Sequence, residues 1–412
     1  TRLPRAIRDV YKRQSYYDET NQLSTSLKRK CPINCASSIF TFTYSHLDKL
    51  FSQRQRPTME VPGYNTLVYY ATPPHSYIST AIFLSYILAA LYSTFKITYS
   101  LYKQYTIIFH KPTPESNGNL KAAKPARARH IKIYAFLASI SFATLSYHML
   151  MFLITHYLEW SGAKTLSPNV ITVERLKRWM LASTLFHDFA QDLVKDAPNA
   201  VWTQAAILGT WFWNVYIGQK GMDLLISRLK RKCANLVVAR TRKYDASTMR
   251  DYVLLSQVLP ISFTISLFLI QLHLSSPDLA PPKAAGEPKE PLTPRRKPIA
   301  TLQIPNILLN AALLALPALR TNSVFDILLL VSRAVLLLPH FSFVSLRNSD
   351  VTKCITVSGG FAMANIAMMR KDMTFGGVVG ALGDGGYAVK ALGWDAVLGI
   401  VVFMVLGWGG GV

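Results

Sequence analysis

Charged residues are scarce in this 412-residue sequence, and acidic ones are the scarcer kind. Asp and Glu together number 22, against 45 Lys and Arg, and only 16% of all residues are charged while half are hydrophobic. A soluble domain carries about 25% charged residues, so this composition argues against a soluble globular protein. The positive excess does not indicate nucleic-acid binding, because the basic residues flank apolar stretches, as they do in cytoplasmic loops of membrane proteins.

Cysteines and catalytic signatures are also few. The four cysteines, at positions 31, 35, 233 and 354, are too few for a disulfide framework. There is no P-loop, no H-E-x-x-H zinc motif and no G-x-S-x-G nucleophile motif. We therefore expect no cofactor and no metal ion. Because the sequence also lacks N-x-[ST], glycosylation gives no information about which side of a membrane each loop faces.

The two ends of the chain differ in character from the rest. Residues 1–14 resemble a translated sequencing adaptor, and we expect a fragment because the chain begins at Thr1 without an initiating Met. Residues 15–74, polar and interrupted by prolines, predict a flexible N-terminal segment. At the other end, 14 of the 21 glycines lie between Gly359 and Gly411. This Gly-rich tail indicates either close packing of small residues between helices or an error of assembly or truncation.

Seven apolar stretches of about 15–24 residues dominate the remainder, each close to the thickness of a bilayer. They predict an all-α fold, a polytopic transmembrane helical bundle of about seven spans with flexible loops. The spans are expected at 77–95, 133–156, 200–217, 252–274, 302–319, 324–338 and 391–408. Pro260 interrupts the fourth span, where a bundle tolerates a kink.

The spans fall into two groups. Helices 1–4 occupy 75–274 and helices 5–7 occupy 301–412, with a loop rich in proline and charge at 275–300. Two weakly apolar segments, 354–369 and 373–383, are interpreted as interfacial, re-entrant or additional short spans, so the count of seven is open by one or two.

The loops predict an orientation. Loops 96–132, 158–199, 218–251 and 275–300 contain 8, 5, 9 and 5 Lys and Arg respectively. This alternation places loops 96–132 and 218–251 in the cytoplasm and the N-terminus outside or in a lumen. The expected location is an endomembrane or the plasma membrane.

A charged helix predicted at 173–195 carries His187, Asp188 and Asp192. The two aspartates share one helical face and resemble part of the aspartate motif of membrane-bound aromatic prenyltransferases, which implies Mg²⁺ binding. The second, longer motif of those enzymes is absent. The interpretation we prefer is an amphipathic helix at the membrane interface with a solvated charged face.

Ionisable residues inside the predicted spans are the other candidates. His148 lies in span two, and Asp326 and Arg333 lie on one face of span six, seven residues apart. Arg333 needs a partner, which we expect to be Asp326, a carbonyl group or another helix. Asp395 opens span seven, where it is expected to cap the helix N-terminus.

Four short strings resemble uncharacterised multi-pass membrane proteins of filamentous fungi. They are FHDF at 186–189, WTQ at 202–204, WFWN at 211–214 and LGWD at 392–395. The resemblance implies a fungal-like endomembrane protein and gives no activity.

Two hypotheses about function follow. The first is an integral multi-pass membrane protein that is structural, accessory or transport-related. The alternative is a membrane-embedded enzyme acting on a lipophilic substrate, such as a terpene cyclase, which would need a carboxylic acid kept neutral in an apolar pocket. Its catalytic candidates are Asp188, Asp192 and Asp395. The partners we expect are the lipid bilayer and a lipophilic small molecule, with no nucleic acid; the sequence gives no oligomeric state.

Overall fold

The computed structural model describes residues 76–109, 118–163, 172–182, 184–232, 246–258, 260–275, 300–322, 324–341 and 344–408. All of them belong to one compact unit, Leu67–Val412. The described part is 89% helical, with twelve α-helices, so the predicted all-α class is confirmed. The predicted segments 1–14 and 15–74, and nearly all of loop 275–300, lie outside the described residues.

Within the described ranges, three helices are long and apolar enough to cross a membrane. They are α4 (Tyr77–Phe109), α5 (Gly118–Ser161) and α15 (Tyr387–Trp408). Two further apolar helices, α10 (Ile261–Leu274) and α11 (Gln303–Ala318), are shorter than the ~20 residues that a perpendicular span needs. The helical class is therefore as predicted, whereas the number of seven spans is not confirmed.

The long helices expose large apolar side chains. Phe95 on α4 is 76% exposed, and Phe403 and Trp408 on α15 are 65% and 71% exposed. Contiguous exposed apolar surface of this kind is costly in water and is stable in lipid, so the exposed faces of α4 and α15 are compatible with a membrane protein.

The fourth predicted span, 252–274, is not one helix. It consists of α9 (Ala246–Val258) and α10, and these run antiparallel. The Tyr252 hydroxyl donates to the carbonyl of Leu267 at 3.4 Å, and the Tyr252 ring lies 5.4 Å from that of Phe268. Pro260 lies midway between the paired positions, so the chain turns back there instead of continuing with a kink.

The α9–α10 hairpin is supported from α4. Asp251, near the start of α9, pairs with Lys96, and the hydroxyl of Tyr86, ten residues earlier on α4, donates to the carbonyl of Gln257. Near the end of α10, the side-chain amide of Gln271 donates to that of Gln104 on α4, so α10 has returned toward the end of α4. The hairpin therefore enters and leaves at the end of the bundle where α4 ends.

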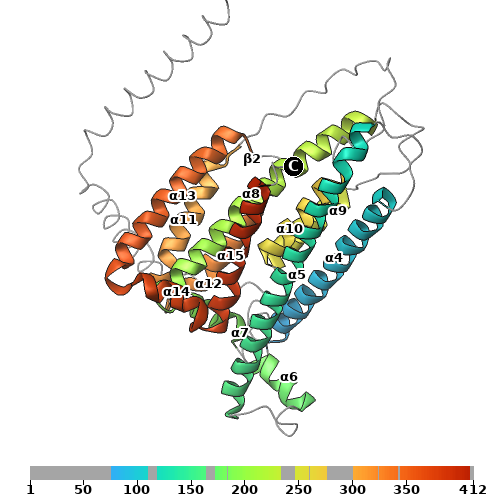
Figure 1. Ribbon diagram of the computed structural model, residues 1–412. Helices are drawn as coiled ribbons and strands as arrows, with labels where there is room; N and C mark the ends of the chain where they lie inside the picture. The colour runs from blue at the N-terminus through green and yellow to red at the C-terminus, as the bar shows by residue number, and fades with distance from the viewer. Residues whose placement is uncertain are drawn as a thin grey trace, which may run out of the picture. The chain divides into compact units, whose positions relative to one another are not determined.

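Four other helices complete the bundle: α8 (Ala197–Lys232), α11, α12 (Phe325–Leu337) and α13 (Asn348–Met369). α11 and α13 lie side by side and run in parallel (Figure 1), because Asn306 pairs with Cys354 and Asn310 with Ser358. The weakly apolar segment predicted at 354–369 is thus part of a 22-residue helix.

Short elements connect the long helices. They are α6 (Val173–Ala182), α7 (Leu185–Leu193), α14 (Phe375–Gly383), the 3₁₀ turns η3 (Leu338–His340) and η4 (Arg370–Asp372), and the two-residue strands β1 (Ala300–Thr301) and β2 (Val344–Ser345), which pair in parallel. The helix predicted at 173–195 was wrong as a single element, since the chain breaks around Thr184 between α6 and α7.

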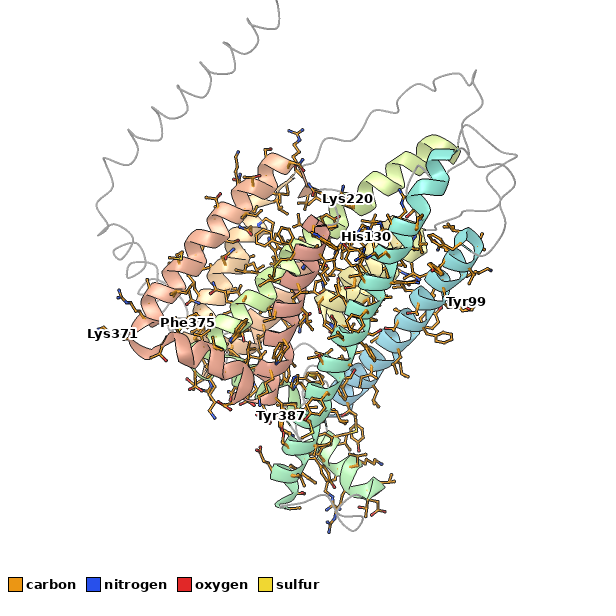
Figure 2. All side chains as sticks on the ribbon, in the orientation of Figure 1. Tyr99, His130, Lys220, Lys371, Phe375 and Tyr387 are labelled. Carbon is orange, nitrogen blue, oxygen red and sulfur yellow. The ribbon has the colours of Figure 1, made fainter. Side chains whose placement is uncertain are left out.

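Two ends of the bundle are distinguished below. The basic end is where α4 ends, α5 begins and α8 ends; the α7 end is where α4 begins, α5 ends and α7 lies. Figure 2 places His130 and Lys220 toward the basic end, and Lys371, Phe375 and Tyr387 toward the α7 end. The packing centres on α10, all fourteen residues of which are buried, and on a second cluster around Trp211 of α8.

Candidate functional site

The break at Pro260 is the most unusual feature inside the bundle. Proline has no N–H and disfavours helical backbone in the residue before it, so α9 ends at Val258 and α10 begins at Ile261. A break of this kind leaves backbone N–H and carbonyl groups unpaired in an apolar interior, where each costs free energy unless another group binds it.

Asp395 of α15 binds the freed N–H groups. Its two carboxylate oxygens accept from Ile261 N at 3.0 Å and from Ser262 N at 2.9 Å, so the carboxylate caps the N-terminus of α10. Negative charge is favourable there because of the helix dipole. The expectation that Asp395 caps its own helix was wrong, since α15 begins at Tyr387, eight residues earlier.

Arg333 and Tyr86 bind the freed carbonyl. The Nη1 atom of Arg333, on α12, donates to the carbonyl oxygen of Gln257 at 3.2 Å, and the Tyr86 hydroxyl donates to the same oxygen. The partner of Arg333 is therefore a carbonyl group on another helix, one of the expected alternatives. The tip of the α9–α10 hairpin, from Gln257 to Ser262, is held by side chains from α4, α12 and α15.

Asp188 belongs to a second polar cluster, at the α7 end. Its Oδ2 atom lies 3.1 Å from Nε2 of His156 and accepts from the Thr184 hydroxyl at 2.6 Å. Trp179 Nε1 donates to His156 Nδ1 at 3.1 Å. Because an indole N–H only donates, His156 Nδ1 is an acceptor, so its Nε2 carries the proton and donates to Asp188. This chain of contacts joins α5, α6 and α7.

Asp326 makes a similar contact with a histidine, His187 of α7. Its Oδ1 atom lies 2.9 Å from Nδ1 of His187 on α7. Gln191 Nε2 lies 2.8 Å from Nε2 of the same ring and donates to the carbonyl of Arg320 at 3.3 Å. Asp326, one of the three partners considered for Arg333, therefore pairs with His187, and Arg333 pairs with the Gln257 carbonyl.

Asp192 faces a different environment. Burial raises the pKa of its carboxyl group, the nearby cations Lys195 and Arg320 oppose that shift, and the negative charges of Glu159 and Asp188 add to it. Among the described residues, no group of three or more His, Cys, Asp or Glu side chains is placed to hold a metal ion. Asp188 and Asp192 are therefore not joined by a third such side chain in the described part of the chain.

His148 lies on α5 beside aromatic rings. Its ring is 5.2 Å from that of Tyr147 and 6.4 Å from that of Tyr387, whose face also carries the Lys390 ammonium at 5.1 Å. The buried Nδ1 of His148 has no hydrogen-bond partner in the part of the chain that the structure describes. Cys354 is buried and free, while the cysteines at 31, 35 and 233 lie outside the described side chains.

The three catalytic candidates are not brought together. Asp395 binds the tip of the α9–α10 hairpin, Asp188 binds His156, and Asp192 lies one helical turn beyond Asp188. The sequence did not indicate Tyr86 or Gln257. It also did not indicate the ion pair of Lys96 Nζ with Asp251 Oδ2 at 2.7 Å, because Lys96 falls in the predicted loop 96–132 and not in the predicted first span. The available signal was Pro260, which interrupts the apolar run that follows Asp251.

No protein-family model, curated protein or solved structure shows significant similarity to this chain.

Proposed function

We propose that this protein is a transport-related multi-pass integral membrane protein in which the α9–α10 hairpin enters the bilayer from the basic end without crossing it. Seven helices cross in this proposal: α4, α5, α8, α11, α12, α13 and α15, of which α11 and α12, with 16 and 13 residues, cross together with the residues that adjoin them. The number of proposed spans is therefore still seven, but α13 replaces the fourth predicted span, 252–274.

The directions of the helices support this topology. α11 ends beside α7, where the Arg320 carbonyl meets Gln191, and α12 starts there with Asp326 beside His187. α12 ends near Asn214 of α8, which donates to the Leu336 carbonyl. α13 then returns to the α7 end, where Asn365 meets Gln204. α11, α12 and α13 therefore alternate in direction, as successive membrane spans do.

The distribution of charge supports a cytoplasmic basic end. With a hairpin at α9–α10, the proposed topology puts the segments 97–132, 218–251 and 275–300 at the basic end, and they contain 7, 9 and 5 Lys and Arg. Loop 158–199, at the α7 end, contains 5. The positive-inside rule then orients the α7 end and the N-terminus toward the outside or a lumen.

The observation that carries the transport-related proposal is the hairpin tip. Broken helices inside membrane bundles occur where the backbone is buried in protein or lines a pathway, and they are typical of transporters and channels. Here one carboxylate accepts from both freed N–H groups of the tip: protonation of Asp395 would remove its charge and weaken its hold on Ile261 and Ser262. We therefore propose proton-coupled movement of the α9–α10 hairpin.

Labelling of single cysteines tests the topology. In a variant with the four native cysteines replaced by serine, we would introduce Lys289→Cys, Arg240→Cys or Lys164→Cys and label intact vesicles with an impermeant maleimide. The first two positions are expected to react from the same side and the third from the opposite side. Reaction of positions 240 and 289 from opposite sides would overturn the hairpin.

Proton flux tests the function. Proteoliposomes with an internal pH dye and an imposed potential are expected to conduct protons faster than protein-free liposomes. Asp395→Asn keeps the shape of the side chain but not its charge, and should slow that flux about tenfold, the effect of ~1.4 kcal/mol on a barrier. Asp326→Asn, outside the hairpin tip, is the matched control. Flux equal to that of empty liposomes would contradict the proposal.

A further inference from the structure

A groove of about 600 Å³ lies between α4, α5 and α10. α4 and α5 both pack on α10, which forms the floor of the groove. The residues that line it are Thr94, Thr98, Leu101, Tyr102 and Tyr105 of α4, Ile131, Lys132, Ala135, Ala138, Ser139 and Phe142 of α5, and Phe263, Leu267 and Ile270 of α10. None of the candidate aspartates is among them.

The lining is apolar with a single charge. Among the described residues that line the groove, Lys132 is the only cation, and none is acidic. Lys132 is exposed, and within the described residues it makes no ion pair or hydrogen bond. The hydroxyl of Thr94 is buried and likewise has no hydrogen-bond partner there.

The charge lies at one end of the groove. Lys132 is on the part of α5 near the basic end, and Phe142 is ten residues further along, so the groove extends for about 15 Å of helix. Lys103 and Arg129, which are close in sequence to lining residues and are exposed, add positive charge at the same end of the two helices. An apolar channel with cations only at its mouth complements an amphiphile with an anionic head.

We propose that this groove binds one acyl chain of an anionic phospholipid, with the phosphate at Lys132. The inference rests on the proposed membrane integration, and it goes beyond it by naming a ligand class and its site. Lys132 favours a headgroup of net negative charge over a zwitterionic one because an ammonium near the bilayer surface attracts anionic lipid. The groove opens between two membrane helices, so a lipid reaches it sideways from the bilayer.

Photolabelling of the full-length protein tests the site. The protein would be reconstituted in phosphatidylcholine nanodiscs with a trace of phosphatidylserine carrying a diazirine on its acyl chain. After irradiation, mass spectrometry should locate the label on 94–105, 131–142 and 263–270. Unlabelled phosphatidylserine should compete for that label, and phosphatidylcholine should not.

Two variants and two controls make the test specific. Lys132→Gln should reduce labelling of the groove by about fivefold, the effect expected of one lysine near an anionic surface. Lys353→Gln, an exposed lysine on α13, should leave it unchanged. Ala135→Trp, which fills the groove from an exposed position, should abolish labelling, whereas Phe136→Trp on the next position of α5 should not.

The outcomes separate this inference from the proposed topology. Equal labelling by phosphatidylcholine and phosphatidylserine probes, insensitive to Lys132→Gln, would show only the ordinary lipid shell and would overturn the site. Release of the protein from membranes by alkaline carbonate would instead refute membrane integration. Thermal unfolding of each variant in detergent confirms that lost labelling is not lost folding.

Discussion

Gly218 allows α8 to approach the turn η3 closely. A Cβ atom at this position would lie 2.6 Å from the backbone oxygen of Pro339 and 3.1 Å from Cδ1 of Leu346. The backbone oxygen cannot move aside as a side chain would, so α8 and η3 must separate. We expect Gly218→Ala to destabilise the protein by about 1–3 kcal/mol, as overpacking does.

The measurement is thermal unfolding in detergent. Gly209→Ala is the matched control, because it lies on the same helix and its Cβ would meet nothing within 4 Å. Alanine forms helices better than glycine, so that variant should be as stable as the wild type or more so. Equal stability of the two variants would show that α8 and η3 are not in close contact.

Asp192 predicts a pH dependence of stability. Burial raises the pKa of this carboxyl group, so the folded protein keeps the proton to a higher pH than the unfolded chain does. The favourable contribution is complete below the unfolded pKa of about 3.9 and is lost as pH rises through the folded pKa. Asp192→Asn should therefore stabilise the protein at about pH 7 and have no effect near pH 3.5.

Unfolding temperatures at the two pH values test this prediction. Asp196→Asn is the control, since Asp196 is exposed at the start of α8, where Asn caps a helix as well as Asp does. A stabilisation by Asp192→Asn that is the same at both pH values would exclude ionisation as its cause.

At the scale of elements, the sequence predicted which segments are helical better than how they pair. The stretches expected at 302–319 and 324–338 correspond to α11 (Gln303–Ala318) and α12 (Phe325–Leu337) within two residues. Apolar length determines these bounds directly. The α9–α10 hairpin could not be predicted in this way, because Pro260 is compatible with a kink as well as with a reversal.

The reversal depends on contacts that are distant in sequence. Asp395 is 134 positions from Ile261, and Tyr86 is 171 positions from Gln257. A sequence read without an alignment identifies Asp395 and Arg333 as costly inside a membrane, yet it does not give their partners. The same holds for His156 and Asp188, which lie 32 positions apart on different helices.

For α13 the sequence predicted only a weakly apolar segment, because the polar residues of this helix lower its mean hydropathy. Two of them face α11 or α8: Ser358 donates to the Oδ1 atom of Asn306 at 3.0 Å and accepts from Asn310 at 2.9 Å, and Asn365 donates to Gln204 at 2.7 Å. Meanwhile Ile355 and Met363 of α13 are 55% and 68% exposed. Interhelical hydrogen bonds of this kind stabilise membrane bundles by about 1 kcal/mol each.

At the scale of the whole molecule, the hairpin changes which loops share a side. A crossing helix at 252–274 would place loops 233–245 and 276–299 on opposite sides, with 9 and 5 Lys and Arg in the segments 218–251 and 275–300. The antiparallel pairing of α9 and α10 instead brings the start of α9 and the end of α10 to the same end of the bundle. The orientation of the whole chain therefore depends on whether the segment around Pro260 reverses.

A distance between two spin labels decides this. Arg250→Cys on α9 and Ser275→Cys after α10, in a variant free of native cysteines, are 25 residues apart. One continuous helix would separate these positions by about 37 Å, whereas adjacent antiparallel helices bring them to about 10–20 Å. We expect the short distance, because Tyr252 pairs with Phe268 and the two labelled positions continue that antiparallel register toward the basic end.

The same spacing on α5 provides the control. Ala135→Cys and Trp160→Cys are also 25 residues apart, both are exposed, and both lie on a helix that runs unbroken from Gly118 to Ser161. That pair should give about 37 Å. A long distance for both pairs would show that α9 and α10 form one crossing helix; loop 276–299 would then lie on the side opposite loop 233–245, and Asp395 would have no hairpin tip to hold.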